Sequence, residues 1–141
     1  MPLNEDLWTC PKCGHQFINA NTYHSCGNFN LEDHFLGKDE QVREISEALV
    51  ELVEGIGPVK VYAQKTRIIF QVRTRFASVV TRKSWLILQI WLKRKAEHPL
   101  LQRIEMYTYR DYGLILRLNK VEDIDDALEN LIHEAYALGS Q

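Results

Sequence analysis

The chain has 141 residues, 45% of them hydrophobic and 26% charged, which fits a soluble globular protein with one ordinary domain and a small appendage. Its longest apolar run, around residues 84–92, contains Gln89 and is too short to cross a bilayer, which excludes a helical membrane protein. The net charge of −2 conceals a partition, because residues 1–59 carry −7, residues 60–110 carry +10 and residues 111–141 carry −5. A basic middle between acidic ends indicates either neutralisation within the fold or a surface that faces an anion.

Residues 1–30 contain the pattern of a zinc-binding module. Cys10 and Cys13 stand in the segment WTCPKCGH, and His24 and Cys26 stand in the segment NTYHSCG. Three thiols and an imidazole are ligands that a tetrahedral Zn²⁺ prefers, and a site closed by four protein ligands is typical of structural zinc. We therefore predict that Cys10, Cys13, His24 and Cys26 hold a structural Zn²⁺.

Two other histidines, His15 and His34, are alternatives to His24 as the fourth ligand. Three cysteines cannot all pair as disulfides within one chain, and we find no signal peptide or other targeting segment, so a secreted disulfide fold is not expected. Free cysteines indicate a reducing compartment, and we expect a cytoplasmic protein. Because residues 1–30 have few apolar side chains, the metal would supply their folding free energy, about 10–16 kcal/mol in small zinc peptides.

The remaining residues, 31–141, are expected to form a separate α+β domain, which begins with a short connector at 31–37. The spacing of apolar residues over 39–54 predicts an amphipathic helix. Its buried face would consist of Val42, Ile45, Leu49, Leu52 and Val53. The helix should end at the glycines and proline of residues 55–58.

After this helix the hydrophobic period changes to two, which predicts β-strands. Strands are expected over residues 59–64, 66–76, 77–81, 85–92, 101–107 and 113–118, with breaks near residues 65, 82–84, 98–99 and 110–113. Short turns join antiparallel neighbours, so these segments predict an antiparallel sheet of five or six strands.

A second amphipathic helix is expected over residues 121–138. Its apolar stripe would consist of Ile124, Leu128, Leu131, Ile132 and Ala135. Asn119 and Glu122 resemble a capping box at its start, and Gly139 stands where the helix should stop. Because two helices can cover only one face of such a sheet, the predicted fold class is α+β, with the zinc module preceding a sheet backed by two helices.

The face of the sheet that the helices leave open combines cations with aromatic rings. Strand alternation puts Ile68, Phe70, Val72, Leu86, Leu88 and Ile90 under the helices. The same alternation puts on the open face Lys60, Tyr62, Lys65, Arg67, Arg73, Arg75, Trp85, Gln89, Trp91, Lys93, Arg103, Tyr107 and Tyr109, and Arg117 is a further candidate for this face.

Cations bind phosphates, and aromatic rings stack on unpaired bases. We therefore predict non-catalytic binding of DNA, RNA or another polyanion by the open face. The residues expected to carry it are Lys65, Arg67, Arg73, Arg75, Trp85, Trp91 and Arg103.

Two other interpretations stay open. The same face could contact a protein partner or a second copy of the chain as a homodimer, because aromatic sheet faces are also buried in interfaces. A small-ligand binder or an enzyme would need a pocket between the sheet and the last helix, with Arg67, Tyr107 or Asp125 at its mouth. The sequence has no phosphate-binding glycine-rich loop, nucleophile elbow or HExxH motif, which favours a non-catalytic role.

Several of these segments together resemble small bacterial proteins that carry the domain of unknown function 5655. The similarity covers residues 8–139 and rests on the cysteine and histidine pattern, on GPV at 57–59, KTRIIF at 65–70, FASV at 76–79, WL at 85–86, Asp125 and AY at 135–136. The resemblance implies a zinc ribbon attached to an α+β domain, with His24 and Cys26 as the second ligand pair. That family has no settled activity, so the resemblance implies no reaction.

Overall fold

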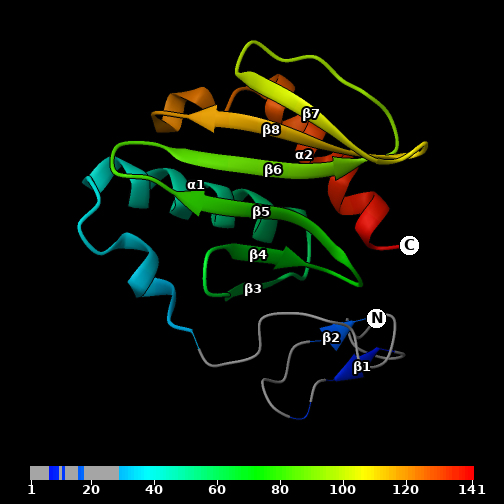
Figure 1. The fold of residues 1–141 in the computed structure, drawn as a ribbon, viewed down its shortest axis with the longest axis horizontal. Helices are drawn as coiled ribbons and strands as arrows, with labels where there is room; N and C mark the ends of the chain where they lie inside the picture. The colour runs from blue at the N-terminus through cyan, green and yellow to red at the C-terminus, as the bar shows by residue number, and fades with distance from the viewer. Residues whose placement is uncertain (1–6, 10, 12–15, 18–28) are drawn as a thin grey trace.

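A six-stranded antiparallel sheet with two helices behind it makes up the larger part of the molecule (Figure 1). The computed structural model describes residues 7–9, 11, 16–17 and 29–141. The predicted zinc ligands Cys10, Cys13, His24 and Cys26 lie outside these residues, as does the alternative ligand His15. The predicted fold class is confirmed for the α+β part, and the zinc site stays a prediction.

The large sheet contains β3 (Lys60–Ala63), β4 (Ile68–Gln71), β5 (Arg75–Thr81), β6 (Leu86–Leu92), β7 (Leu101–Thr108) and β8 (Asp111–Leu118). The helices are α1 (Glu40–Ile56) and α2 (Asp126–Gly139), with short 3-10 turns η1 (Leu31–Phe35) and η2 (Val121–Asp123). Near the N-terminus, β1 (Trp8–Thr9) pairs with β2 (Gln16–Phe17). None of the helices in the described part of the chain is long and apolar enough to cross a membrane.

The strand order is β3-β4-β5-β6-β8-β7, and every neighbouring pair is antiparallel. Most consecutive strands are neighbours, as their short turns predict. The expectation that β6 and β7 are neighbours is wrong, because β8 lies between them. The connection from Leu92 to Leu101 is long enough to pass over the position that β8 fills.

The strand predicted over residues 66–76 is divided by a turn at Val72–Thr74. No glycine or proline marks this turn in the sequence. The Thr74 backbone N–H and hydroxyl both donate to the carbonyl of Gly139, at 3.0 and 3.2 Å, at the end of α2. A contact between residues 65 positions apart therefore supports the turn, together with the local bond from the Val72 N–H to the Thr74 carbonyl at 3.0 Å, and local sequence patterns do not predict the distant contact.

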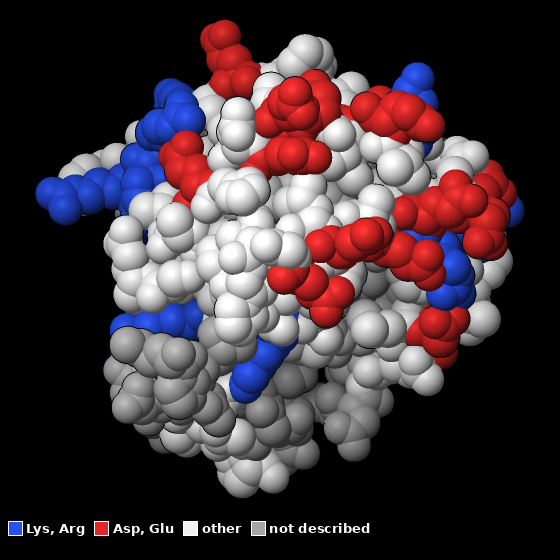
Figure 2. Space-filling model, turned by 180° about the vertical axis from the view of Figure 1, so that it is seen from behind, with Lys and Arg blue, Asp and Glu red and all other residues white. Residues whose placement is uncertain are grey.

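The core lies between the helices and one face of the sheet, with the pattern that the sequence predicts. Helix α1 buries Val42, Ile45, Leu49 and Val53, and α2 buries Leu128, Leu131, Ile132 and Ala135. Strand residues such as Phe70, Leu88 and Leu116 cover them from the sheet. Burial of each such side chain stabilises the fold by about 1.5–3 kcal/mol relative to exposure. Among the charged side chains on the outer surface of the helical layer, acids predominate (Figure 2).

The start of α2 differs from the predicted capping box. The carboxylate of Asp123 accepts the backbone N–H groups of Asn119 and Lys120, at 2.8 and 3.2 Å, and so closes η2 ahead of the helix. Asp125 is the N-cap of α2, and its carboxylate accepts the N–H of Leu128 at 2.8 Å. Asn119 and Glu122 therefore do not cap this helix.

Asp125 also joins α2 to the connection between β6 and β7. The backbone N–H of Leu100 donates to Nδ1 of the buried His98, which leaves Nε2 as the donor to the Asp125 carboxylate at 2.9 Å. The hydrogen bond from His98, followed by the one from Leu128, holds the pKa of Asp125 below its ordinary value. One carboxylate thus satisfies both a helix end and a buried imidazole.

Asp125→Ala should lower the free energy of unfolding by about 1–2 kcal/mol, because the variant has no side-chain cap and leaves a buried N–H without an acceptor. A carboxylate with a lowered folded-state pKa stabilises the fold above its unfolded pKa of about 3.9, and this contribution is lost as the pH falls through the folded pKa. Urea unfolding should therefore show the full difference between wild type and variant at pH 7 and a shrinking one below about pH 4. Asp126→Ala, at the next position, is the control. Equal losses of unfolding free energy in the two variants would contradict the role of Asp125 as the N-cap of α2 and the partner of His98.

Candidate functional site

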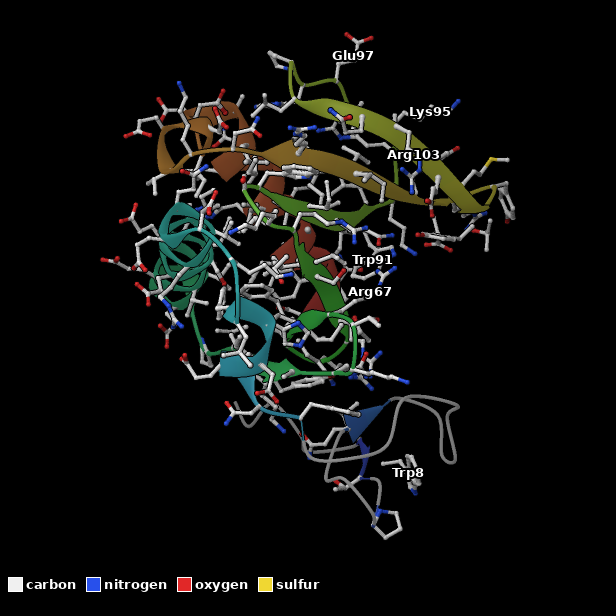
Figure 3. All side chains as sticks on the ribbon, turned by 60° about the vertical axis from the view of Figure 1, so that its left-hand side comes forward. Trp8, Arg67, Trp91, Lys95, Glu97 and Arg103 are labelled. Carbon is white, nitrogen blue, oxygen red and sulfur yellow. The ribbon has the colours of Figure 1, made fainter. Side chains whose placement is uncertain are left out.

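The candidate site is the sheet face opposite the helices, called here the open face. Figure 3 shows Arg67, Trp91 and Arg103 projecting from this face, away from α1. The strand register aligns one row of residues across β4, β5, β6, β8 and β7, namely Ile69, Ser78, Gln89, Ile115 and Arg103. The first four of these residues are at most 5% exposed, although the two helices cover only the opposite face of the sheet. Longer side chains of the open face therefore lie over this row.

A chain of hydrogen bonds crosses the open face from β4 to β7. Arg67 Nη1 donates to Gln89 Oε1 at 2.8 Å and, more weakly, to Ser78 Oγ at 3.3 Å. Gln89 Nε2 donates to the hydroxyl oxygen of Tyr107, and that hydroxyl donates to Glu105 Oε2 at 3.0 Å. Arg103 completes the chain with two bonds to Glu105 Oε1, at 3.1 and 2.9 Å.

Two members of this chain, Glu105 and Tyr107, have shifted pKa values. Hydrogen bonds from Arg103 and Tyr107 hold the pKa of Glu105 below its usual range. Burial, followed by the neighbouring Glu105 carboxylate, raises the pKa of Tyr107. At neutral pH the hydrogen-bonded chain therefore contains a carboxylate, a neutral phenol and two guanidinium groups. Its bonds also hold the Arg67 guanidinium in one orientation.

Gly113 makes room for the contact between Gln89 and Tyr107. A Cβ atom at position 113 would lie 2.8 Å from Gln89 Nε2 and 2.9 Å from both Cε2 and the hydroxyl oxygen of Tyr107. These separations are shorter than van der Waals contact, so a larger residue would push the two side chains apart. Gly113 lies within β8, which begins at Asp111, and not in the preceding turn. This glycine is therefore explained by close side-chain packing and not by chain reversal.

A cavity of about 260 Å³ opens beside this chain and is called here the central cavity. Val80, Ile87 and Ile115 give it an apolar part, and Ser78, Gln89 and Gln102 add neutral hydrogen-bonding groups. Its charged residues are Arg67, Arg82, Arg103 and Glu105. Three guanidinium groups and one carboxylate give the lining a net formal charge of +2.

The two tryptophans of this region lie on either side of the central cavity along β6. The guanidinium carbon of Arg117 lies 4.0 Å from the ring centre of Trp85, in a cation–π contact. Trp91, six residues further along, lines a second cavity of about 370 Å³ together with Arg75 and residues of α2. At the rise of an extended strand the two positions are about 20 Å apart.

The structure brings together five of the seven binding residues predicted from the sequence: Arg67, Arg75, Trp85, Trp91 and Arg103. Arg75 Nε donates to the Tyr62 hydroxyl at 3.1 Å. The other two, Lys65 and Arg73, lie in the turns at opposite ends of β4. Arg73 Nη1 contacts the backbone carbonyl of Gln141 at 3.4 Å.

The central cavity contains residues that the sequence prediction missed, namely Ser78, Arg82, Gln102 and Glu105. The amino-acid sequence nevertheless contains a signal that predicts part of this cavity. Ser78 and Gln89 are polar residues within the apolar strands RFASVVT and LILQIWL, and both are buried on the open face. A buried polar residue needs a partner, and Arg67 supplies it in both cases.

The residues expected at the mouth of a small-ligand pocket lie on opposite faces of the sheet. Arg67 and Tyr107 both bond to Gln89 on the open face, whereas Asp125 begins α2.

His34, the alternative zinc ligand within the described residues, has one ring nitrogen already engaged. Its Nε2 bonds to the carbonyl oxygen of Gln64 at 2.8 Å, which leaves Nδ1 as the nitrogen that could bind a metal. The described residues contain no group of three or more histidine, cysteine, aspartate or glutamate side chains that could hold a metal.

A double-mutant cycle would test whether Gly113 provides room for Tyr107. Gly113→Ala should destabilise the wild-type protein and cost less in a Tyr107→Ala background, because the ring is then absent and the Gln89 amide that the new methyl group also meets can move into its place. We expect a coupling energy of about 0.5–3 kcal/mol from urea unfolding. Gly55→Ala in α1 is the control, since nothing lies within 4 Å of its Cβ, and additive effects of the Gly113 and Tyr107 changes would refute the packing role.

The model of one protein family matches the chain over residues 31–139, from η1 to the end of α2. The family is described as a domain of unknown function, DUF5655, and the chain belongs to it. No curated protein and no solved structure matches the chain significantly.

Proposed function

We propose that this member of the DUF5655 family binds single-stranded nucleic acid, DNA or RNA, through its open face and catalyses no reaction there. The observation that carries the proposal is the combination, on one sheet face, of excess guanidinium groups with two tryptophans. The family assignment supports the α+β domain alone and adds no activity. The proposal therefore rests on charge, on stacking surfaces and on their spacing.

The charge distribution favours a polyanionic ligand on this face. The glutamates of α1 and the acids of α2 lie on the opposite side of the molecule (Figure 2). Two cations of the basic segment pair with acids outside the sheet, Arg94 with Glu134 at 2.7 Å and Lys83 with Asp39 at 3.1 Å. The open face keeps an excess of arginine, and a one-sided field of this kind attracts phosphates over a range set by the salt concentration.

The aromatic groups favour an unpaired strand over a duplex. The Arg117 guanidinium lies against Trp85, so a base can stack on the outer side of the guanidinium plane. Trp91, half-buried at the other end of β6, offers a second stacking surface. Bases within a duplex are already stacked and would not reach either group, whereas each stacked base of a single strand is worth about 1–3 kcal/mol.

The β7–β8 hairpin favours a second candidate, contact with another protein or a second copy of the chain. Met106 is 66% exposed, Tyr107 49% and Tyr109 75%, and β7 is an edge strand of the sheet. Exposed rings beside an unpaired strand edge are features of docking surfaces. Light scattering distinguishes this candidate, because a stable dimer would have twice the mass of one chain.

The N-terminal segment is part of the proposal as a structural zinc module. Cys10, Cys13, His24 and Cys26 supply four ligands of the kind that Zn²⁺ binds in closed tetrahedral sites. The described part of this segment contacts the sheet, since Gln71 Nε2 donates to the carbonyl of Gln16 at 2.6 Å. Folding of the segment around a metal would thus shape one border of the open face.

Fluorescence anisotropy with labelled oligonucleotides, across a salt series, tests nucleic-acid binding by the zinc-loaded chain. Single strands should bind more tightly than duplexes, and affinity should fall steeply as salt rises. Replacement of Lys65 and Arg73 by glutamine should lower the salt slope by about 0.7 for each phosphate that the variant no longer neutralises. Trp85→Ala should weaken single-strand binding by about 5- to 150-fold, the equivalent of one stacked base, because the Arg117 guanidinium loses the ring that holds it in place for stacking.

The matched control is Arg94→Gln, which removes one positive charge on the side of α2 and should leave the salt slope unchanged. Absence of binding at low salt would refute the proposal. If the protein is then also a dimer whose tryptophans are shielded from quenchers, the contact function takes its place.

Zinc content and thermal stability test the metal module. The purified chain should contain one zinc per molecule, and Cys13→Ser should lose the metal and melt at a lower temperature. His24→Ala should do the same, whereas His15→Ala and His34→Ala should keep the metal. Retention of zinc in His24→Ala, together with its loss in one of the other two variants, would reassign the fourth ligand.

A further inference from the structure

The central cavity carries more positive charge than one phosphodiester group needs. Arg67, Arg82 and Arg103 face a lining that contains one carboxylate, that of Glu105. Glu105 is already paired with Arg103 at 2.9 Å and bonded to Tyr107. Among the described residues no carboxylate is within ion-pair distance of Arg67 or Arg82, so these two arginines account for the net formal charge of +2.

The two guanidinium groups on this side differ in how they are held. Arg67 is half-buried and oriented by Gln89 and Ser78, and both of its contacts use Nη1. The Arg82 side chain is exposed and has no hydrogen-bond or ion-pair partner among the described residues. A fixed cation beside an exposed one forms a site in which the first positions an anion and the second closes on it.

We infer that the central cavity binds a phosphate monoester, the group that ends a nucleic-acid strand or a free nucleotide. A phosphate within a strand carries one negative charge, whereas a monoester carries about −1.5 to −2 at neutral pH and offers three acceptor oxygens. The charge of the lining matches the monoester. Ser78, Gln89 and Gln102 add neutral groups for hydrogen bonding, and the apolar part formed by Ile87 and Ile115 can contact a sugar or base.

This inference rests on the proposed function and adds to it. Internal phosphates would contact exposed cations along the face, such as Lys65, whereas the strand end would occupy the cavity between the two tryptophans. The ligand would then be recognised by its terminus. Strands with a terminal phosphate would bind more tightly than the same strands without one.

The test compares one single-stranded sequence in three forms, with a 5′-phosphate, with a 3′-phosphate and with hydroxyl groups at both ends. The full zinc-loaded chain is titrated with each form by anisotropy. One phosphorylated form should bind about tenfold more tightly than the hydroxyl form, the effect of one further charged hydrogen bond. Arg82→Gln should abolish this preference, and any loss of affinity through internal phosphates should be the same for all three forms.

The control is Arg110→Gln, which removes an exposed cation that lies over Tyr109, outside the cavity lining, and should leave the preference intact. Equal affinity of the three forms would overturn the inference and leave nucleic-acid binding in place. If no strand binds, the chain is titrated with inorganic phosphate and with a mononucleotide, followed by NMR. Binding of the mononucleotide that is abolished in Arg82→Gln would keep the monoester site and overturn the strand proposal, and no binding would overturn both.

Discussion

Two helices cover one face of the six-stranded sheet, and within the described residues the other face is covered mainly by its own side chains. This constraint explains the composition of the open face. The central row of Ile69, Ser78, Gln89 and Ile115 is buried without a helical layer above it, because long side chains from neighbouring strands lie over it. Arginine and tyrosine suit this position, since each combines a long apolar stem or ring with a polar end.

The same constraint separates the charges of the molecule. The apolar stripe of each helix is taken up by the core, so the acids lie on the outer helical surface (Figure 2). The basic middle segment forms the sheet and directs its cations to the opposite side. The one-dimensional charge pattern of the sequence thus becomes a difference between two faces, and the face with the arginines also carries Trp85 and Trp91.

Much of the domain could be predicted from periodicity alone. The apolar stripes of residues 39–54 and 121–138 predict both helices, although α2 begins only at Asp126, and strand alternation assigns Ile68, Phe70 and Leu88 to the core. The errors share a physical cause, which is dependence on distant partners. The turn at Thr74 is supported by Gly139, and the cap of α2 is shared with His98. The position of β8 between β6 and β7 is likewise a matter of sheet assembly that no short segment encodes.

The candidate site could be predicted only in part, because its cavity also depends on contacts between distant segments. Alternation brings Arg67, Trp85, Trp91 and Arg103 to one face, but the cavity between them depends on which strands are neighbours. Gly113 illustrates the difference, since a glycine beside a predicted turn suggests chain reversal, whereas here it makes room for Tyr107 within a strand. The polar interruptions at Ser78 and Gln89 were the accessible signal, because a polar residue in a buried strand needs a partner.

The bond between Thr74 and Gly139 has a consequence for the order of folding. The β4–β5 turn lacks glycine and proline and has one local backbone bond, from Val72 to Thr74, so part of its support comes from a contact that closes a loop of 65 residues. Such a closure costs more chain entropy than a local turn, and its cost must be met before the contact is gained. During synthesis, the turn cannot obtain this contact until α2 has left the ribosome. The contacts of the β4–β5 turn are therefore completed only after most of the chain exists, and a φ-value near zero at Thr74 would be the kinetic sign of this late step.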